Sequence, residues 1–200
     1  VTHFHPDHYS GVPLLINSLC FTKRKEPLII LGLPYVIQKL KLLLQVVDHR
    51  SWVGIFPIVF KEIQPDFDRE VINNEEFNLS TCPTDHKIPS IAVKYVSKNA
   101  KKTIVYSSDT RPCRNMIKFA SGADIFIREC NYLDEEEEAY KYGHSTAKQV
   151  GEEVRKIDIK DLFLVHHGCD SKEEIEKMRT LVGEGLYKVY IPDDLSFVDL

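Results

Sequence analysis

The stretch "THFHPDHYSG" occupies residues 2–11 and decides the fold expected for this chain. It places three histidines and an aspartate within six positions, namely His3, His5, Asp7 and His8. Imidazole nitrogens and carboxylate oxygens together are typical ligands of zinc, and manganese and iron accept similar sets. Four such groups in so short a segment therefore predict a metal site at the start of the chain.

The composition describes an ordinary soluble globular protein. Two hundred residues with 43% hydrophobic and 28% charged side chains predict one domain spanning residues 1–200. The net charge of −4 gives no reason to expect tight non-specific binding to nucleic acid, and no apolar run reaches transmembrane length. The odd number of cysteines and the lack of a CxxC pair favour buried thiols in a reducing, cytoplasmic compartment over disulfides. These cysteines are Cys20, Cys82, Cys113, Cys130 and Cys169.

Hydrophobic patterning predicts an alternation of strands and helices. Residues 33–50 and 145–157 carry apolar side chains at helical spacing, and Ser145 or Thr146 could cap the second helix. Further helices are expected over 172–182 and from Pro112 to about residue 120, and the acidic run at 134–138 is expected to be a solvated helix start or loop. The predicted strands cover 27–32, 53–60, 90–96, 102–108, 123–127, 162–165 and 187–191. A strand-rich early part and an alternating later part indicate an α/β fold with layered sheets and helices.

Three more candidate ligands lie beside predicted strands. His86 precedes one strand, whereas Asp109 and His166 each follow one. Strand ends on one edge of a layered α/β fold converge in space, and the loops there carry chemistry on a rigid scaffold. Seven candidate ligands exceed one tetrahedral site and fit two metal ions that share a bridging group.

The ordered motifs resemble those of the metallo-β-lactamase superfamily. "THFHPDH" matches its HxHxDH signature, and the later motifs are similar to those of its ribonuclease Z-like branch. These later motifs are "TDHKIPSIAVKY", "YSSDTRP", "GHST" and "LFLVHHG". The resemblance covers residues 2–168 and implies a four-layered αββα sandwich. It also implies that N-terminal strands preceding the signature in this family are missing here.

The resemblance assigns a role to each ligand. It implies two divalent metal ions, with zinc expected and manganese or iron as alternatives. The first ion would be held by His3, His5 and His86, the second by Asp7, His8 and His166, and Asp109 would bridge the two. His166 is chosen over its neighbour His167 because the motif places the ligand directly after the apolar strand. His49 and His167 are then left for surface or hydrogen-bonded structural roles.

The same resemblance implies three catalytic residues. Asp7 would help to position or deprotonate the attacking water. His144, in "GHST", would contact the substrate phosphate and donate a proton, and Glu129, in "RECNY", would support His144. Arg128 stands where related proteins often have histidine, and both Arg128 and Arg111 are expected in salt bridges rather than at the substrate.

A metal-dependent phosphodiesterase using a metal-activated water is therefore the expected function. Only 23 positions separate His86 from Asp109, too few for the protruding arm of ribonuclease Z enzymes that process transfer RNA. The 57 positions from Asp109 to His166 likewise leave no room for the extra domain of β-CASP nucleases. This layout is similar to small cyclic phosphodiesterases, so a small phosphodiester is favoured as substrate.

Three alternatives stay open. The chain could be a ribonuclease Z-type endonuclease that acts on the 3′ end of transfer RNA. It could hydrolyse a lactone or thioester with the same metals, because the walls of a site rather than its ions select the substrate. It could also be a non-catalytic binding subunit, against which the complete ligand set argues. Since related enzymes often form homodimers, self-association is expected, and no membrane partner is.

Overall fold

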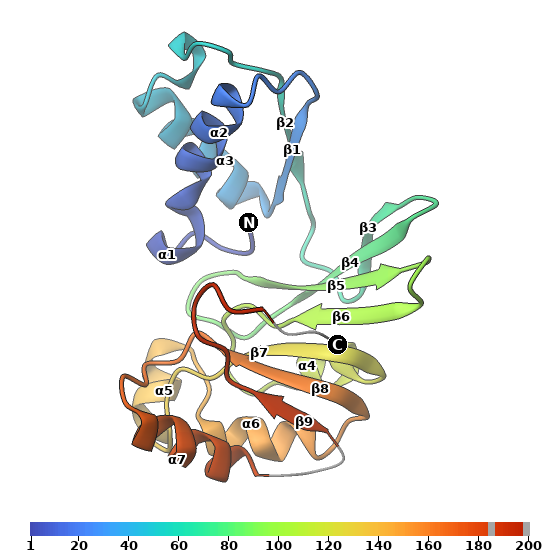
Figure 1. Cartoon of the computed structure of the whole chain (residues 1–200), viewed down its shortest axis with the longest axis vertical. Coiled ribbons are helices and arrows are strands. Elements are labelled where there is room, and N and C mark those ends of the chain that lie inside the picture. Colours follow the sequence, from blue (N-terminus) through green and yellow to red (C-terminus); the bar gives the residue numbers. More distant parts are fainter. Residues whose placement is uncertain (184–186, 198–200) are drawn as a thin grey trace. The chain divides into compact units, whose positions relative to one another are not determined.

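The computed structural model describes residues 1–183 and 187–197, which form two compact units, Val1–Pro65 and Asp66–Leu200. Both units combine helices with strands, so the predicted α/β class is confirmed (Figure 1). The single domain expected for residues 1–200 stays a prediction. Within the described ranges, no helix combines the length and the apolar character that crossing a bilayer requires.

The first unit contains helices beside a two-stranded parallel sheet, in which Leu28 pairs with Ile58. Its helix α3 covers the sheet because its apolar side chains repeat at helical spacing. The buried members of this stripe are Val36, Ile37, Leu40 and Leu44. The elements are α1 (Pro6–Tyr9), α2 (Gly11–Phe21), β1 (Leu28–Gly32), α3 (Pro34–Val46), the short 3-10 helix η1 (His49–Ser51) and β2 (Ile58–Glu62).

Two boundaries predicted in this unit were wrong, and the helices α1 and α2 were missed. The α-helix predicted to residue 50 ends at Val46, and Asp48 then takes a left-handed φ of 46°. The strand predicted from residue 53 starts only at Ile58, because Gly54 has a φ of 81° and Pro57 cannot donate to a ladder. Helix α1 is a single turn with no buried residue, and α2 buries only Ile16 and Cys20, so neither has a clear apolar stripe.

The second unit is built on a seven-stranded sheet with the order β3-β4-β5-β6-β7-β8-β9. Pairing is antiparallel from β3 to β6 and parallel from β6 to β9. Parallel neighbours require crossover segments, and helices supply them here. The strands are β3 (Arg69–Asn73), β4 (Phe77–Pro83), β5 (Ile91–Ser97), β6 (Lys102–Tyr106), β7 (Ala123–Glu129), β8 (Ile159–Val165) and β9 (Lys188–Tyr190). The helices are α4 (Arg114–Ala120), α5 (Glu136–Tyr142), α6 (Ala147–Val154) and α7 (Lys172–Val182).

The core of this unit lies between the sheet and its helices. Phe126 and Leu162 point from the central strands into a cluster with Phe119 of α4 and Val150 of α6. Figure 1 shows α6 and α7 alongside each other below β7, β8 and β9. Their approach is close at Gly151, where an added Cβ would come within 2.3 Å of the Val182 carbonyl oxygen. This packing holds the strand ends that carry candidate ligands.

Local sequence signals in the second unit were mostly read correctly. Thr146 caps α6 through a capping box with Gln149, and α7 occupies the predicted residues. The acidic run begins α5, so its reading as a helix start is confirmed. Helix α4 begins at Arg114 rather than Pro112, whereas β3 and β4 were not predicted. The five cysteines are free, as expected.

Candidate metal centre

The first group of predicted ligands lies in the loop that leads into α1. His5 has the extended backbone of an N-cap residue, and Pro6 opens the helix. Nε2 of His3 lies 3.1 Å from Nδ1 of His5. Two ligand atoms on one tetrahedral zinc ion are about 3.3 Å apart, given metal–nitrogen distances of about 2.0–2.1 Å. These two nitrogens therefore have the spacing of ligands that share an ion.

Contacts with β1 and α3 hold this loop in place. The amino group of Val1 donates to the Leu31 carbonyl oxygen at 2.8 Å, and the Phe4 amide donates to the Tyr35 hydroxyl at 3.3 Å. Asp7 and His8 follow on the first turn of α1, where Oδ2 of Asp7 lies 3.2 Å from Nε2 of His8. The Asp7 side chain is 58% exposed and that of His8 only 11%, so the aspartate is open to solvent while the histidine is held.

The second group gathers around one oxygen of Asp109. Oδ2 of this aspartate lies 3.8 Å from Nε2 of His86 and 3.8 Å from Nε2 of His166. These separations exceed the length of a hydrogen bond but suit atoms that coordinate the same cation or two neighbouring cations. The side chains of Asp109 and His86 are almost completely buried. One carboxylate oxygen is thus equidistant from two imidazole nitrogens, which is compatible with a ligand that bridges two ions.

A hydrogen bond sets the tautomer of His86. Its Nδ1–H donates to the Gly143 carbonyl oxygen at 2.7 Å, since a carbonyl only accepts. Nε2 therefore keeps its lone pair and turns it toward Asp109, which is how a second contact orients a metal-binding histidine. Gly143 has a φ of 89°, and a Cβ there would lie 2.7 Å from Nδ1 of His86. Glycine at this position thus permits both the backbone turn and the close approach of the ring.

Two of the ligand-bearing strand ends contain unusual backbone. Ser108, directly before Asp109, has a φ of 54°, and His166 itself has a φ of 55°. A left-handed conformation in a residue other than glycine costs about 1–3 kcal/mol and tends to occur at functional sites. The side chain of Asn131 helps to hold the backbone of His166, because its Nδ2 donates to the His166 carbonyl oxygen at 3.0 Å and lies 3.2 Å from Nδ1 of His166.

His144 and Glu129 lie next to each other, as the resemblance implied. Helix α5 ends at Tyr142 and is capped by Gly143, and Nδ1 of the following His144 lies 3.3 Å from Oε1 of Glu129. The buried Glu129 also accepts hydrogen bonds from the amides of Thr110 and Asn131, both at 3.1 Å. The rings of His144 and His166 are stacked with centroids 5.4 Å apart. A histidine held by a buried carboxylate therefore stands next to a candidate ligand.

The donor set of the second unit fits a divalent ion. Ligand atoms of Asp109, His144 and His166 lie within 4.8 Å of one another. The set combines the buried carboxylate of Asp109 with the imidazoles of His144 and His166. This is the chemistry of zinc sites, and manganese or iron tolerates it as well.

The remaining predicted residues have the following contacts. The salt bridges expected for Arg111 and Arg128 are confirmed, with Asp85 at 3.0 Å and Glu153 at 2.9 Å. Nδ1 of His49 is hydrogen-bonded to the Leu44 carbonyl oxygen, so its structural role is confirmed. Nδ1 of His167 is buried, and no hydrogen bond to it is found among the described residues, so the hydrogen-bonded role predicted for it is not seen at this atom.

Sequence reasoning missed Gly143 and Asn131. Gly143 directly precedes the predicted His144, and a glycine after an acidic helix start is a signal for a helix C-terminus. Asn131 had no such signal, because its contact with His166 joins residues 35 positions apart.

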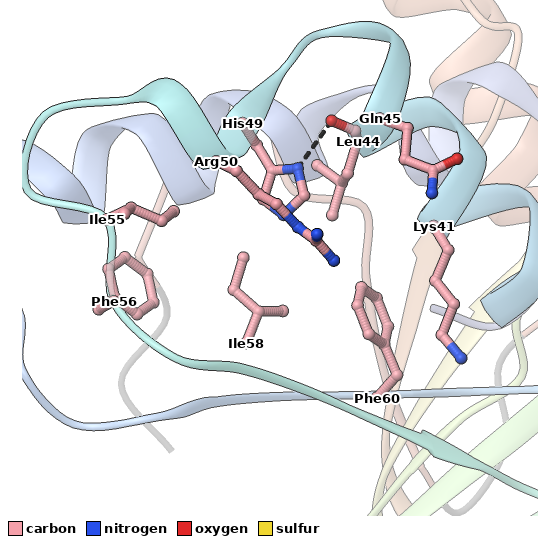
Figure 2. A pocket seen from close by; sticks show the side chains of 9 residues that line it. All are labelled: Lys41, Leu44, Gln45, His49, Arg50, Ile55, Phe56, Ile58 and Phe60. Carbon is pink, nitrogen blue, oxygen red and sulfur yellow. Dashed lines mark hydrogen bonds between the residues drawn. The ribbon is translucent and has the colours of Figure 1, made fainter.

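A pocket of about 370 Å³ lies in the first unit (Figure 2). Leu44, Phe56 and Ile58 contribute apolar surface, and Figure 2 shows the side chains of His49 and Arg50 directed between them. The full lining is Lys41, Leu44, Gln45, His49, Arg50, Ile55, Phe56, Ile58 and Phe60. None of these residues is a predicted ligand, so the pocket adds nothing to the candidate centre.

Comparisons of sequence place these observations among known proteins. The family model described as "Beta-lactamase superfamily domain" matches residues 1–167. Ribonuclease Z of Pyrococcus abyssi is 31% identical over 211 positions, which cover 84% of this chain and 68% of the relative. Ribonuclease Z of Picrophilus torridus is 28% identical over 213 positions, which cover 84% of this chain and 67% of the relative.

Solved structures show the same fold. The short form of human tRNase Z, ELAC1, matches with a TM-score of 0.77 at 21% identity, covering 100% of this chain and 77% of that one. The metallo-beta-lactamase fold protein YhfI from Bacillus subtilis matches with a TM-score of 0.71 at 20% identity, covering 94% and 72%. At these identities the likeness shows the fold alone, and it confirms the type of α/β fold predicted from the sequence.

Proposed function

This chain belongs to the beta-lactamase superfamily, in which it is a ribonuclease Z-like, metal-dependent hydrolase, and we propose that it cleaves phosphodiester bonds. The observation that carries this proposal is the pairing of His144 with Glu129 beside the candidate ligand His166. Such a pair supplies a hydrogen-bond donor for a phosphate and a proton for a leaving oxygen.

Seven residues would hold two divalent ions, with zinc first and manganese or iron as alternatives. His3, His5 and His86 would bind one ion, Asp7, His8 and His166 the other, and Asp109 both. The 3.1 Å between the ring nitrogens of His3 and His5 supports this assignment within the first unit. The two 3.8 Å distances to Oδ2 of Asp109 support it within the second. When bound, two such ions offset the charge of a phosphodiester and lower the pKa of water toward neutrality.

His144 is the proposed acid of the reaction. Its Nδ1 faces Glu129, so Nε2 is the nitrogen that turns toward a substrate. The carboxylate of Glu129 stabilises the positive charge of the ring, as an acid beside a catalytic histidine does. The Nε2 proton passes to the leaving oxygen as the phosphorus–oxygen bond breaks. Asp7, with its exposed carboxylate, positions the attacking water and accepts its proton as the new bond forms.

Two features favour a small substrate. The segment between His86 and Asp109 holds only β5, a turn and β6, which leaves no protruding arm. The match to the Picrophilus relative spans 213 positions while covering 84% of this chain, so that relative carries residues with no counterpart here. The second feature is the acidic start of helix α5, formed by Glu136, Glu137 and Glu138. The seven residues of this helix span about 10 Å, and His144 lies just beyond its C-terminal end. These charges repel a long polyanion more than a single phosphodiester.

Cleavage of transfer RNA at its 3′ end is the second candidate, because two of the matched relatives are named ribonuclease Z. Turnover of three substrate classes separates the candidates: a bis(aryl) or small cyclic phosphodiester, a lactone, and precursor transfer RNA. We expect the chain loaded with zinc or manganese to hydrolyse the small phosphodiester. Removal of the 3′ trailer without activity on the small diester would exclude the small substrate, and activity confined to the lactone would exclude phosphodiesterase activity. A chain that stays metal-free after zinc or manganese is added would instead be a binding subunit.

The contacts of His144 give this proposal a second test. Replacement of His144 by Ala should lower kcat for the phosphodiester about 10²- to 10⁴-fold, the usual contribution of a positioned acid. The affinity for zinc, measured by competition with a chelator, should change much less. A variant that keeps full turnover would remove His144 from the mechanism.

We also propose that the chain forms a homodimer through its first unit and acts in the cytoplasm. Several large apolar side chains of that unit are exposed and would be available to such an interface. Phe21 is 79%, Val46 84% and Val53 94% exposed. The five free cysteines support a reducing compartment. Sedimentation of the chain at several concentrations tests the dimer, and a monomer throughout would refute it.

A further inference from the structure

We propose that Arg128 is a positioning residue that ties the loop carrying Asp109 to the loop carrying His144. This inference rests on the proposed function, because it concerns the geometry of the same site. It assigns to Arg128 a role beyond the salt bridge expected from the sequence. The argument depends on where its five N–H groups go.

The guanidinium group is completely buried, and each of its donors is used. A guanidinium offers five N–H groups in a rigid plane. Nε and Nη2 both donate to Oε2 of Glu153, at 3.1 and 2.9 Å. Nη2 also donates to Oγ of Ser145 at 2.6 Å. Nη1 donates to the carbonyl oxygens of Thr110 and Glu129, at 3.4 and 3.2 Å.

Two of these partners are chain neighbours of functional residues, and a third is a functional residue itself. Thr110 follows Asp109, Ser145 follows His144, and Glu129 is the carboxylate that holds His144. Oγ of Ser145 adds a direct link, since it donates to the Thr110 carbonyl oxygen at 2.8 Å. One side chain thus fixes the end of β7 and both loops that follow β6 and α5.

The acidic partner is fixed as well. Glu153 lies in α6 and is 4% exposed, and its Oε1 accepts a hydrogen bond from the Cys113 amide at 3.0 Å. Burial lowers the pKa of Arg128, whereas the negative charges of Glu153 and Glu129 raise it by more. The net pKa is therefore raised, and the guanidinium group stays charged. Both oxygens of Glu153 therefore accept hydrogen bonds, and the ion pair with Arg128 is held in one geometry.

A buried ion pair is weak evidence for stability, because removing two charges from water offsets much of their attraction. The gain from this pair is geometric. Lysine could retain the charge opposite Glu153, but its ammonium is a single point with three donors and cannot reach Ser145, Thr110 and Glu129 in one plane. The Arg128→Lys variant therefore separates charge from positioning.

We expect Arg128→Lys in the full chain to fold and to keep most of its thermal stability. Its kcat for the small phosphodiester should fall about 10- to 100-fold, the range for residues that orient catalytic or metal-binding groups, while KM changes less. Zinc affinity, measured by chelator competition, should fall about 10-fold because Asp109 loses a support. Arg179→Lys is the matched control, since Arg179 also donates to a backbone carbonyl, that of Val189, but lies on α7.

The double variant Arg128→Met with Glu153→Met provides a second route if the lysine variant unfolds. It removes both buried charges together and leaves apolar side chains of similar size, which many proteins tolerate. We expect it to fold and to show the same losses in kcat and zinc affinity.

Unchanged kcat and zinc affinity in a folded variant at position 128 would overturn the proposal. So would a lower unfolding temperature with unchanged zinc affinity, which would make Arg128 purely structural. If the parent chain hydrolyses no phosphodiester, the proposed function fails, whereas a loss of zinc affinity in Arg128→Lys still supports the positioning role. The two failures are thus distinguishable.

Discussion

The approach of Gly143 to His86 leads to the sharpest test of the candidate centre. Replacing Gly143 by Ala adds a single Cβ to a residue whose φ is 89°. That atom would lie 2.7 Å from Nδ1 of His86 and 3.0 Å from the Lys87 amide nitrogen. The backbone of Lys87 yields little, so the imidazole ring must move away from the carbonyl oxygen that it binds.

The magnitude follows from two contributions. A left-handed conformation costs an alanine about 1–2 kcal/mol. Loss of the hydrogen bond between His86 and the Gly143 carbonyl costs about 1 kcal/mol more. The unfolding free energy should therefore drop by about 2–3 kcal/mol, and metal affinity should fall about 10- to 100-fold because His86 loses the contact that orients it.

Gly122 provides the matched control. Its φ is 81°, but an added Cβ there meets nothing within 4 Å. Gly122→Ala should therefore show the backbone cost of about 1–2 kcal/mol and leave metal affinity unchanged. Thermal unfolding and chelator competition with zinc measure the two quantities in both variants. The reasoning is refuted if Gly143→Ala binds zinc like the parent chain, or if Gly122→Ala weakens zinc binding equally.

Three further predictions concern other parts of the chain. Burial raises the pKa of the Cys82 thiol to about 12 and raises that of Cys130 as well. Neither thiol should therefore react with iodoacetamide at pH 8, which mass spectrometry of the labelled native protein checks. Rapid labelling of either cysteine would contradict the packing. Gly151→Ala should lower the unfolding free energy by about 3 kcal/mol, because its Cβ meets the Val182 carbonyl oxygen, and a denaturant midpoint like that of the parent would count against this contact. A chelator should abolish turnover and lower the unfolding temperature, because a metal at 100-fold above its dissociation constant adds about 2.7 kcal/mol to the unfolding free energy. Calorimetry that shows no shift in the unfolding temperature would argue against a bound ion.

Local signals predicted much of the second unit. Thr146 and Gln149 form a capping box whose two hydrogen bonds join residues three positions apart, so the start of α6 was readable from the sequence. The end of α3 was not, because the apolar pattern continues to Val47, whereas Asp48 adopts a left-handed conformation that the pattern does not indicate. Strand β2 was placed too early for a similar reason, since Gly54 and Pro57 interrupt a run that is apolar throughout.

By itself, the sequence determined which chemical groups are available and in what order. It placed His86, Asp109 and His166 beside predicted strands, whereas the pairing of Glu129 with His144 came from the resemblance of their motifs to a known family. Only the tertiary structure decided that Oδ2 of Asp109 is equidistant from two imidazole nitrogens.

The tertiary structure also decided that the Gly143 carbonyl selects the tautomer of His86, 57 positions away. Periodicity and capping act over a few residues, whereas these contacts join segments that only the packing of a sheet and its helices brings together. Ligand types can therefore be read along a chain, but the direction of each ligand atom depends on distant backbone.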